Sequence, residues 1–307
     1  MDAFQIKTPV AFLVFNRPDT TLKVFEEIRR VRPLKLLVVA DGPRPDRPGE
    51  AEKCAAARAI VEQIDWPCEV LKNYSDTNLG CKRRVFSGLD WVFETVPAAI
   101  ILEDDCLPHP SFFRFCEELL EKYRDDKRVM QIGGCNFQNG IKRGDGSYYF
   151  SIYNHIWGWA SWRRAWKYYD VSISSWRKKI HEEFLYTLFT DKKTVKYWKE
   201  ILDRVQRGEI DTWDYQWTYT VWSHNGLAIL PQKNLISNIG FSEEGTHVKD
   251  THSKLSKMQT FEISSMIHPE KVSRDYNADM YTTKYHYLPP SFPNRFMNKI
   301  RKVFGNT

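Results

Sequence analysis

Apolar runs and amphipathic stretches alternate along the first third of the chain. A continuous apolar run is typical of a strand that is buried on both faces, whereas apolar residues at helical spacing, as in 21–31, indicate a helix. The alternation predicts an α/β fold, with a mostly parallel central sheet and helices on both faces. The expected strands are 9–15, 34–40, 68–71 and 98–102, and the expected helices are 21–31, 50–64, 81–94 and one that begins near Pro110.

The pattern is less regular in the second half of the chain. Trp159, Trp162 and Trp166 lie at positions i, i+3 and i+7, which places them on one face of a helix. We therefore expect a helix across 156–166 that packs through its tryptophans, rather than an aromatic platform for a sugar or a base. Further strands are expected at 129–133, 148–152 and 227–230, and further helices within 175–190, 192–207 and 209–224.

Composition and charge narrow the class of protein. The chain has 307 residues, a hydrophobic fraction of 42% and a net charge of +6. No block of Lys and Arg is long enough for a nucleic-acid-binding arm, so we expect no nucleic acid. A basic surface or an anionic, phosphate-bearing ligand explains the positive charge. The six cysteines lack zinc-ligand spacing, and the sequence shows no export signal and no long apolar run. We therefore expect a cytoplasmic protein with reduced thiols.

The segment 294–305 is basic and amphipathic. A segment of this kind would either touch an anionic membrane surface, which would place the protein peripherally at the inner face of the membrane, or dock as a terminal helix. The sequence alone does not decide between membrane contact and docking as a terminal helix.

Three consecutive acids, Glu103, Asp104 and Asp105, follow an apolar strand. Carboxylates at the end of a buried strand repel one another unless a cation or a donor-rich ligand compensates them. Oxygen ligands suit Mn²⁺ or Mg²⁺, which bind a few carboxylates together with water and substrate phosphate. Asp105 is the predicted metal ligand, while Glu103 and Asp104 would hold donor hydroxyls or metal-bound water. The alternative is a solvated acidic run.

Other polar residues follow the other predicted strands, where open parallel sheets bind their ligands. Asp41 would accept a hydrogen bond from a base or ribose, or would only form a turn with the glycine that follows it. Arg17 follows the first strand, and Arg83 and Arg84 open a helix. Because cations are unfavourable at a helix start, these arginines suggest an anionic partner such as a pyrophosphate, with a solvated surface as the alternative.

Two acids, Asp211 and Asp214, flank Trp213 ahead of a predicted helix. Each would be an N-cap, or one would act as a general base if it reaches an acceptor hydroxyl. The glycine-bounded loop 240–247 would be a lid that orders over a ligand, or an ordinary surface loop.

Taken together, these motifs resemble those of GT-A fold glycosyltransferases, and they are most similar to the N-acetylglucosaminyltransferase I type. An assignment to a bacterial family 2 enzyme is the alternative. The resemblance covers about residues 8–250, and Tyr215 stands where the family has a second acid. It is carried by the acids 103–105 and by the segments Trp157-Gly158-Trp159, Trp213-Asp214-Tyr215-Gln216-Trp217 and 236–247.

The resemblance implies a glycosyltransferase domain at 1–250, with a nucleotide-binding half at about 1–135 and an acceptor-binding half at 136–250, followed by an extension at 251–307. It implies an inverting enzyme that uses Mn²⁺ or Mg²⁺ to move a hexose or N-acetylhexosamine from a UDP-sugar to a glycan or lipid-linked acceptor. Asp214 would be the catalytic base and Asp105 the metal ligand. The donor would be contacted by Arg17, Asp41, Arg83, Arg84, Glu103 and Asp104.

Two other functions remain open on the sequence. A sugar nucleotidyltransferase would normally carry a glycine-rich phosphate loop after the first strand, and residues 15–20 do not form one. A non-catalytic, transferase-like glycan-binding protein would bind free sugar without a metal.

Overall fold

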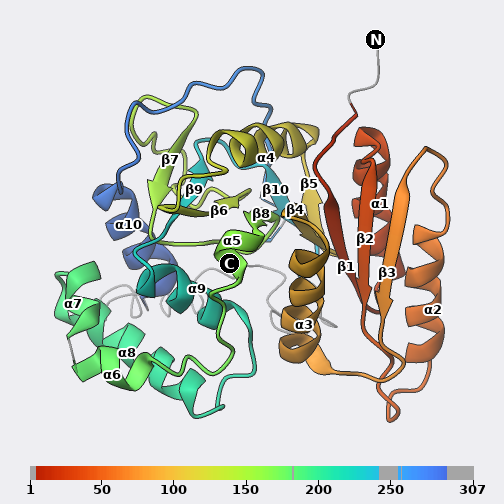
Figure 1. Cartoon of the computed structure of the whole chain (residues 1–307), viewed down its shortest axis with the longest axis horizontal. Coiled ribbons are helices and arrows are strands. Elements are labelled where there is room, and N and C mark those ends of the chain that lie inside the picture. Colours follow the sequence, from red (N-terminus) through yellow and green to blue (C-terminus); the bar gives the residue numbers. More distant parts are fainter. Residues whose placement is uncertain (1–4, 182, 242–254, 257, 289–307) are drawn as a thin grey trace, which may run out of the picture.

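The computed structural model describes residues 5–181, 183–241, 255–256 and 258–288. Within these residues, eight strands form one sheet in the order β3-β2-β1-β4-β8-β6-β9-β7 (Figure 1). Six strands run in the same direction, and β8 and β7 run against their neighbours. The predicted α/β fold with a mostly parallel sheet is therefore confirmed. The strands are β1 Val10–Val14, β2 Lys35–Ala40, β3 Glu69–Tyr74, β4 Ala98–Glu103, β6 Val129–Gly133, β7 Tyr148–Ser151, β8 Trp159–Trp162 and β9 Leu227–Pro231.

Helices cover both faces of this sheet, because its central strands are apolar on both faces. Along β1, Phe12 packs into one hydrophobic cluster, and its neighbours Ala11 and Leu13 pack into the other. The first cluster is closed by α1 Pro18–Val31, α2 Glu50–Val61 and α4 Pro110–Lys122. The second is closed by α3 Gly80–Thr95, α8 Lys192–Gln206 and α9 Asp214–Ser223. The helices predicted in the first half of the chain are confirmed.

The helix predicted across 156–166 is wrong. Residues Trp159–Trp162 form the short strand β8, which pairs with β4 on one side and β6 on the other, and only Arg163–Trp166 are helical (α5). Trp159 and Trp162 consequently point to opposite faces of the sheet and belong to different hydrophobic clusters. A central strand that is buried on both faces needs large apolar residues at odd and even positions, and this produced a spacing that also fits a helix.

The remaining predicted elements are largely confirmed. The strands expected at 129–133, 148–152 and 227–230 correspond to β6, β7 and β9, and the helix expected at 192–207 corresponds to α8. The region 175–190 holds two short helices, α6 Trp176–His181 and α7 Phe184–Leu188. No helix in the described part of the chain is long and apolar enough to cross a bilayer.

A C-terminal element, not predicted from the sequence, packs against the edge of the sheet. It consists of α10 Tyr276–Thr282 and the π-helix η1 Thr283–Tyr287 (Figure 1). The buried Asp279 anchors it: the carboxylate accepts hydrogen bonds from Ser151 Oγ at 2.5 Å and from Arg274 Nε at 2.5 Å. The sequence signal was weak because this element is short and polar, and its stability comes from contacts with a distant strand.

A second sheet, of two strands, brings the segment around residue 238 next to the acids Glu103, Asp104 and Asp105. β5 Cys106–Pro108 pairs antiparallel with β10 Ile236–Asn238, and Ile239 N donates to Asp105 O at 2.8 Å. Residues 240 and 241 therefore lie beside the acids. The rest of the predicted lid, 242–247, and the basic segment 294–305 lie outside the described residues.

Candidate functional site

The three predicted acids surround the carboxyl end of β4. Glu103 is the last residue of the strand and lies opposite Leu13 of β1. Asp104 is buried, and its Oδ2 accepts a hydrogen bond from Phe15 N at 3.1 Å. Asp104 and Asp105 form the turn that leads into β5. The acids thus lie at the edge of the sheet where parallel strands end, which is the position expected for a ligand site.

Asp105 is paired with a residue from the neighbouring strand connection. Arg17 Nη1 donates to Asp105 Oδ2 at 2.7 Å, and both side chains are largely covered. Gly240 packs directly against this pair, so that a Cβ atom at position 240 would collide with the Asp105 carboxylate and lie 2.8 Å from Arg17 Nη1. The pair is therefore held between two segments that are far apart in the sequence.

The acids carry more negative charge than their surroundings compensate. Burial raises the pKa of Glu103 and of Asp104, and repulsion from Asp105 raises both further. The positive charge of Arg17 lowers both pKa values and so opposes this effect. A bound cation would act in the same direction as Arg17, because it favours the ionised carboxylates.

Asp214 joins this group from the other half of the chain. It is the first residue of α9, and its charge contributes to the raised pKa of Glu103. The thiol of Cys81, at the start of α3, lies close to the same acids. Burial raises its pKa to about 12, and repulsion raises it further, from Glu103, Asp214, Asp211 and Asp105. Acids from two distant segments therefore converge near the start of α3.

The position of Asp214 in α9 rules out one of its two predicted roles, that of an N-cap. The N-cap of α9 is Trp213, and no side chain caps this helix, so the N-cap alternative for Asp214 and Asp211 is wrong. Thr212 Oγ1 donates instead to Asp214 Oδ1. Asp211 is exposed, whereas Asp214 is partly buried.

Asp41 organises the loop that leads into α3. Its carboxylate accepts hydrogen bonds from the backbone amides of Gly42, Leu79 and Gly80, at 2.9, 2.9 and 3.1 Å, and from Asn78 Nδ2 at 3.1 Å. These contacts agree with the turn-forming alternative. The predicted contact with a base or ribose stays a prediction.

The two arginines at the start of α3 differ in environment. Arg84 is buried and donates through Nη2 to the backbone oxygen and to Oδ1 of Asn73, at 2.5 and 2.7 Å. It therefore fixes the end of β3, and burial lowers its pKa. Arg83 is exposed on the same helical turn. Their predicted contact with a pyrophosphate stays a prediction.

Glu50 is a structural residue of this edge that the sequence did not reveal. It accepts hydrogen bonds from Asn16 Nδ2 at 2.9 Å and from Arg44 N at 2.7 Å, and it pairs with the Arg44 guanidinium. These contacts tie the loop after β1 to the loop after β2. The only sequence signal was an acid in the first turn of a helix, which normally indicates no more than a favourable helix start.

The acids of this edge could offer only oxygen ligands to a metal ion. Among the residues that the structure describes, no three His, Cys, Asp or Glu side chains are grouped as metal ligands. An ion held by Asp105 would therefore complete its coordination with water and phosphate oxygens, as Mg²⁺ and Mn²⁺ commonly do. The available ligands are carboxylate oxygens with excess negative charge, which suits such an ion.

Comparison with known proteins identifies no family. The chain matches no family model and no curated protein. A UDP-glucose pyrophosphorylase solved in complex with UDP-glucose aligns with 53% of this chain and 79% of its own, at 9% identity and a TM-score of 0.32. A 4-diphosphocytidyl-2C-methyl-D-erythritol synthase from Anaerococcus prevotii aligns with 57% of this chain and 77% of its own, at 12% identity and a TM-score of 0.31.

Proposed function

We propose that the protein is a metal-dependent, inverting glycosyltransferase that moves a hexose or N-acetylhexosamine from a UDP-sugar to a glycan or lipid-linked acceptor. The observation that carries this proposal is the convergence of Asp214 with the acids of β4 at the carboxyl edge of the sheet. Such an edge offers a cation-binding carboxylate and a separate carboxylate that can serve as a base, which are the two groups that this reaction requires.

The donor half of the proposed site is built around Asp105 and Arg17. Asp105 would hold Mn²⁺ or Mg²⁺, which would supply charge neutralisation to the diphosphate of the donor. Arg17 lies within hydrogen-bonding distance of the same carboxylate, so its guanidinium is positioned to contact a phosphate oxygen beside it. Glu103 and Asp104 would accept hydrogen bonds from the hydroxyls of the donor sugar.

The acceptor half is built around Asp214. In the proposed step, the acceptor hydroxyl gives its proton to Asp214 while its oxygen forms a bond to the anomeric carbon. The bond between that carbon and the β-phosphate oxygen breaks, and UDP leaves with the electron pair. The hydrogen bond from Thr212 orients the Asp214 carboxylate, which lies in the first turn of α9.

A thermal-shift panel tests the donor half. The wild-type protein should melt at a higher temperature with UDP or a UDP-sugar, and the shift should be larger with Mn²⁺ than with a chelator, because a ligand of the native state raises the melting temperature. The Asp105→Ala variant should lose the Mn²⁺-dependent part of the shift. The Asp125→Ala variant, which removes a highly exposed acid far from the site, is the matched control.

The same protein preparation separates the two enzyme classes. A glycosyltransferase would release UDP from a UDP-sugar in the presence of an acceptor mixture. A sugar nucleotidyltransferase would instead release pyrophosphate from a nucleoside triphosphate and a sugar phosphate, and that product would refute the proposal. The absence of any shift with nucleotides would refute both.

A further inference from the structure

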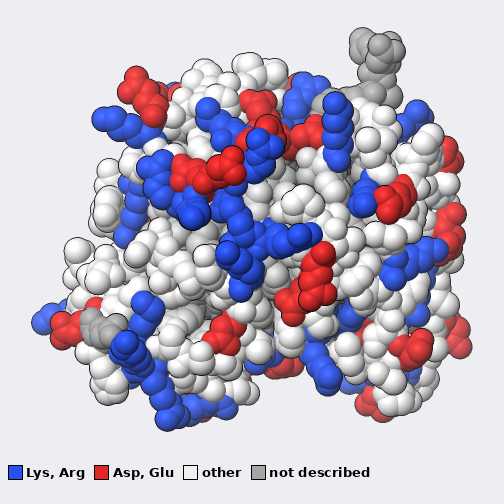
Figure 2. Space-filling view, viewed as in Figure 1, with Lys and Arg blue, Asp and Glu red and all other residues white. Residues whose placement is uncertain are grey.

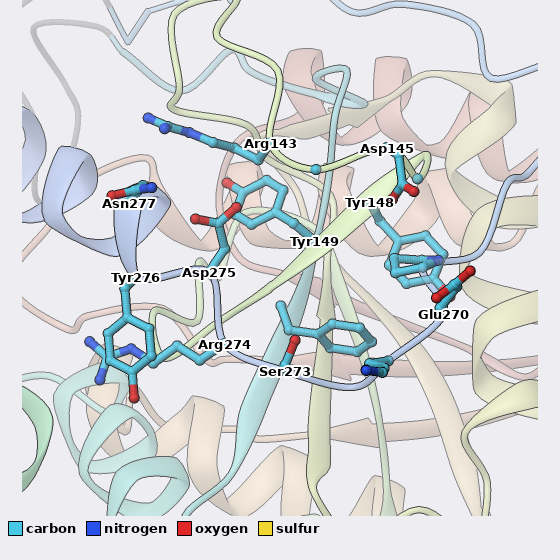
Figure 3. A pocket seen from close by; sticks show the side chains of 15 residues that line it. Arg143, Asp145, Tyr148, Tyr149, Glu270, Ser273, Arg274, Asp275, Tyr276 and Asn277 are labelled. Atoms are coloured by element: carbon cyan, nitrogen blue, oxygen red, sulfur yellow. The ribbon is translucent and has the colours of Figure 1, made fainter.

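A groove of about 500 Å³ lies at the opposite end of the sheet from β3, along the edge strand β7 (Figure 3). Its walls are the loop before β7, the strand itself, and the segment that leads into α10, with lining residues drawn from 143–150 and 269–277. The acids of the proposed transferase site do not line this groove. Its volume falls in the range that is usual for small-molecule sites, about 300–1,000 Å³.

The walls of the groove are held together by contacts within the fold. Asp275 N donates to Phe150 O at 2.8 Å, and Ser147 N donates to Ile267 O at 2.7 Å. Pro269 packs so closely on Gly146 that a Cβ atom there would lie 2.8 Å from the proline ring. The groove is therefore formed before any ligand binds, which lowers the entropic cost of binding.

Charges in the groove balance. The lining contains three cations and three anions, and Figure 2 shows positive and negative side chains side by side over the region of β7 and α10. A surface of this kind offers many hydrogen-bond donors and acceptors without attracting a strongly charged molecule. It therefore favours a neutral, hydroxyl-rich ligand. The charged residues are Arg143, Lys271, Arg274, Asp145, Glu270 and Asp275.

An aromatic ring at the rim supplies a platform. Tyr276 is 65% exposed, and the Arg274 guanidinium lies over its ring at 4.4 Å from the centroid. Arg274 is itself fixed by its ion pair with Asp279 at 2.5 Å. The ring is therefore held in place, with apolar surface open to a ligand. The carbon-bound hydrogens on one face of a sugar ring pack well against such a surface.

We propose that this groove is a second binding site that takes a neutral oligosaccharide. Tyr276 would stack against one sugar ring, and the surrounding charged groups would bind its hydroxyls. Tyr148 lies opposite Pro231 at the carboxyl end of β9, so the groove opens at the same edge of the sheet as the acids. β7 lies four strand spacings from β4, roughly 19 Å, a separation that a short saccharide chain could span.

This site does not depend on the proposed transferase activity, and its test uses no nucleotide. Chitotetraose, cellotetraose and maltotetraose are titrated separately into the full chain, with binding followed by calorimetry and by ligand-observed NMR. At least one should bind. Tyr276→Ala should weaken that binding about tenfold.

Controls make each outcome decisive. Tyr186→Ala, which removes a tyrosine that is 50% exposed on α7, should leave binding unchanged. The proposal is overturned if none of the three tetrasaccharides binds at millimolar concentration. It is also overturned if Tyr276→Ala binds as the wild type does, or if inorganic phosphate displaces the sugar. Sugar binding without any response to UDP would support this site and refute the proposed transferase.

Discussion

Arg17 and Asp105 form an ion pair of 2.7 Å at the carboxyl edge of the sheet, and the backbone of Gly240 closes over it. The pair joins the loop after β1 to the turn after β4, while Gly240 arrives through the two-stranded sheet of β5 and β10. Any diphosphate or cation that binds Asp105 must share or replace this pairing. The charge of the proposed donor site therefore depends on Arg17 as well as on its acids.

Removal of Arg17 should shift the pH dependence of activity. Its charge lowers the pKa of both Glu103 and Asp104, so in Arg17→Ala these carboxyls hold their protons to higher pH. The acidic limb of the kcat/KM profile should move to higher pH, because the proposed mechanism needs the ionised acids to bind the donor. Arg30→Ala, which removes an exposed arginine on α1, the helix that follows Arg17, is the control. An unchanged acidic limb in Arg17→Ala would contradict the coupling.

Asp214→Asn should lower kcat by about 10²- to 10⁴-fold, because the amide cannot accept the acceptor proton. Nucleotide binding, measured by calorimetry with UDP and Mn²⁺, should remain close to that of the wild type. Asp211→Asn is the matched variant and should retain most of the activity, since Asp211 is exposed. The reverse result, with Asp211→Asn inactive and Asp214→Asn active, would assign the base to Asp211.

Stability should respond to pH through Glu103. Its folded-state pKa is raised, so the unfolded chain releases this proton at a lower pH than the folded protein does. The stability contributed by the protonated group is present at low pH and is lost as the pH rises through the folded pKa. Without ligands, Glu103→Gln should therefore raise Tm relative to the wild type by a few degrees at about pH 8.5, and by less at about pH 4.5.

Calorimetric scans at both pH values measure this difference. The control Glu121→Gln changes a largely exposed glutamate on α4 and should shift Tm little at either pH. An equal shift for Glu103→Gln at both pH values would mean that the raised pKa is not the cause.

Trp159→Ala should destabilise the protein by about 3–5 kcal/mol, the usual cost of deleting a large buried aromatic side chain. Trp159 is fully buried, and its ring lies 5.8 Å from that of Trp213, the residue before Asp214. Any folded fraction should also lose activity, because the start of α9 loses its support. Denaturant titration measures the first effect. Tyr168→Ala, at a position 43% exposed, should change neither.

The sequence predicted the first half of the fold well for a physical reason. Strands such as β1 and β2 are buried on both faces, so they appear as uninterrupted apolar runs, and the intervening helices keep one apolar face. The prediction failed at β8, where four residues between two strands carry a spacing that a helix also satisfies. It missed α10 because this element is held by Asp279 and Arg274 rather than by an apolar stripe.

The candidate site was predictable only in part. Polar residues after strand ends indicated which edge of the sheet would carry it, and Glu103, Asp104 and Asp105 do lie there. The sequence could not show that the Asp41 carboxylate accepts hydrogen bonds from Gly42 and from residues 78–80, or that Arg84 is turned towards Asn73. Those contacts depend on how distant segments pack, which local spacing does not determine.

The position of β8 in the middle of the sheet limits where the chain can tolerate insertions and deletions. Trp159 and Trp162 lie on a strand of only four residues, and their side chains pack into the hydrophobic clusters on opposite faces of the sheet. Insertion or deletion of one residue within this strand would move every later side chain of the strand to the other face of the sheet, since alternate residues face opposite ways. Insertions and deletions are therefore excluded from this strand, whereas the turn at Asn139 and Gly140, which is open to solvent, can absorb them.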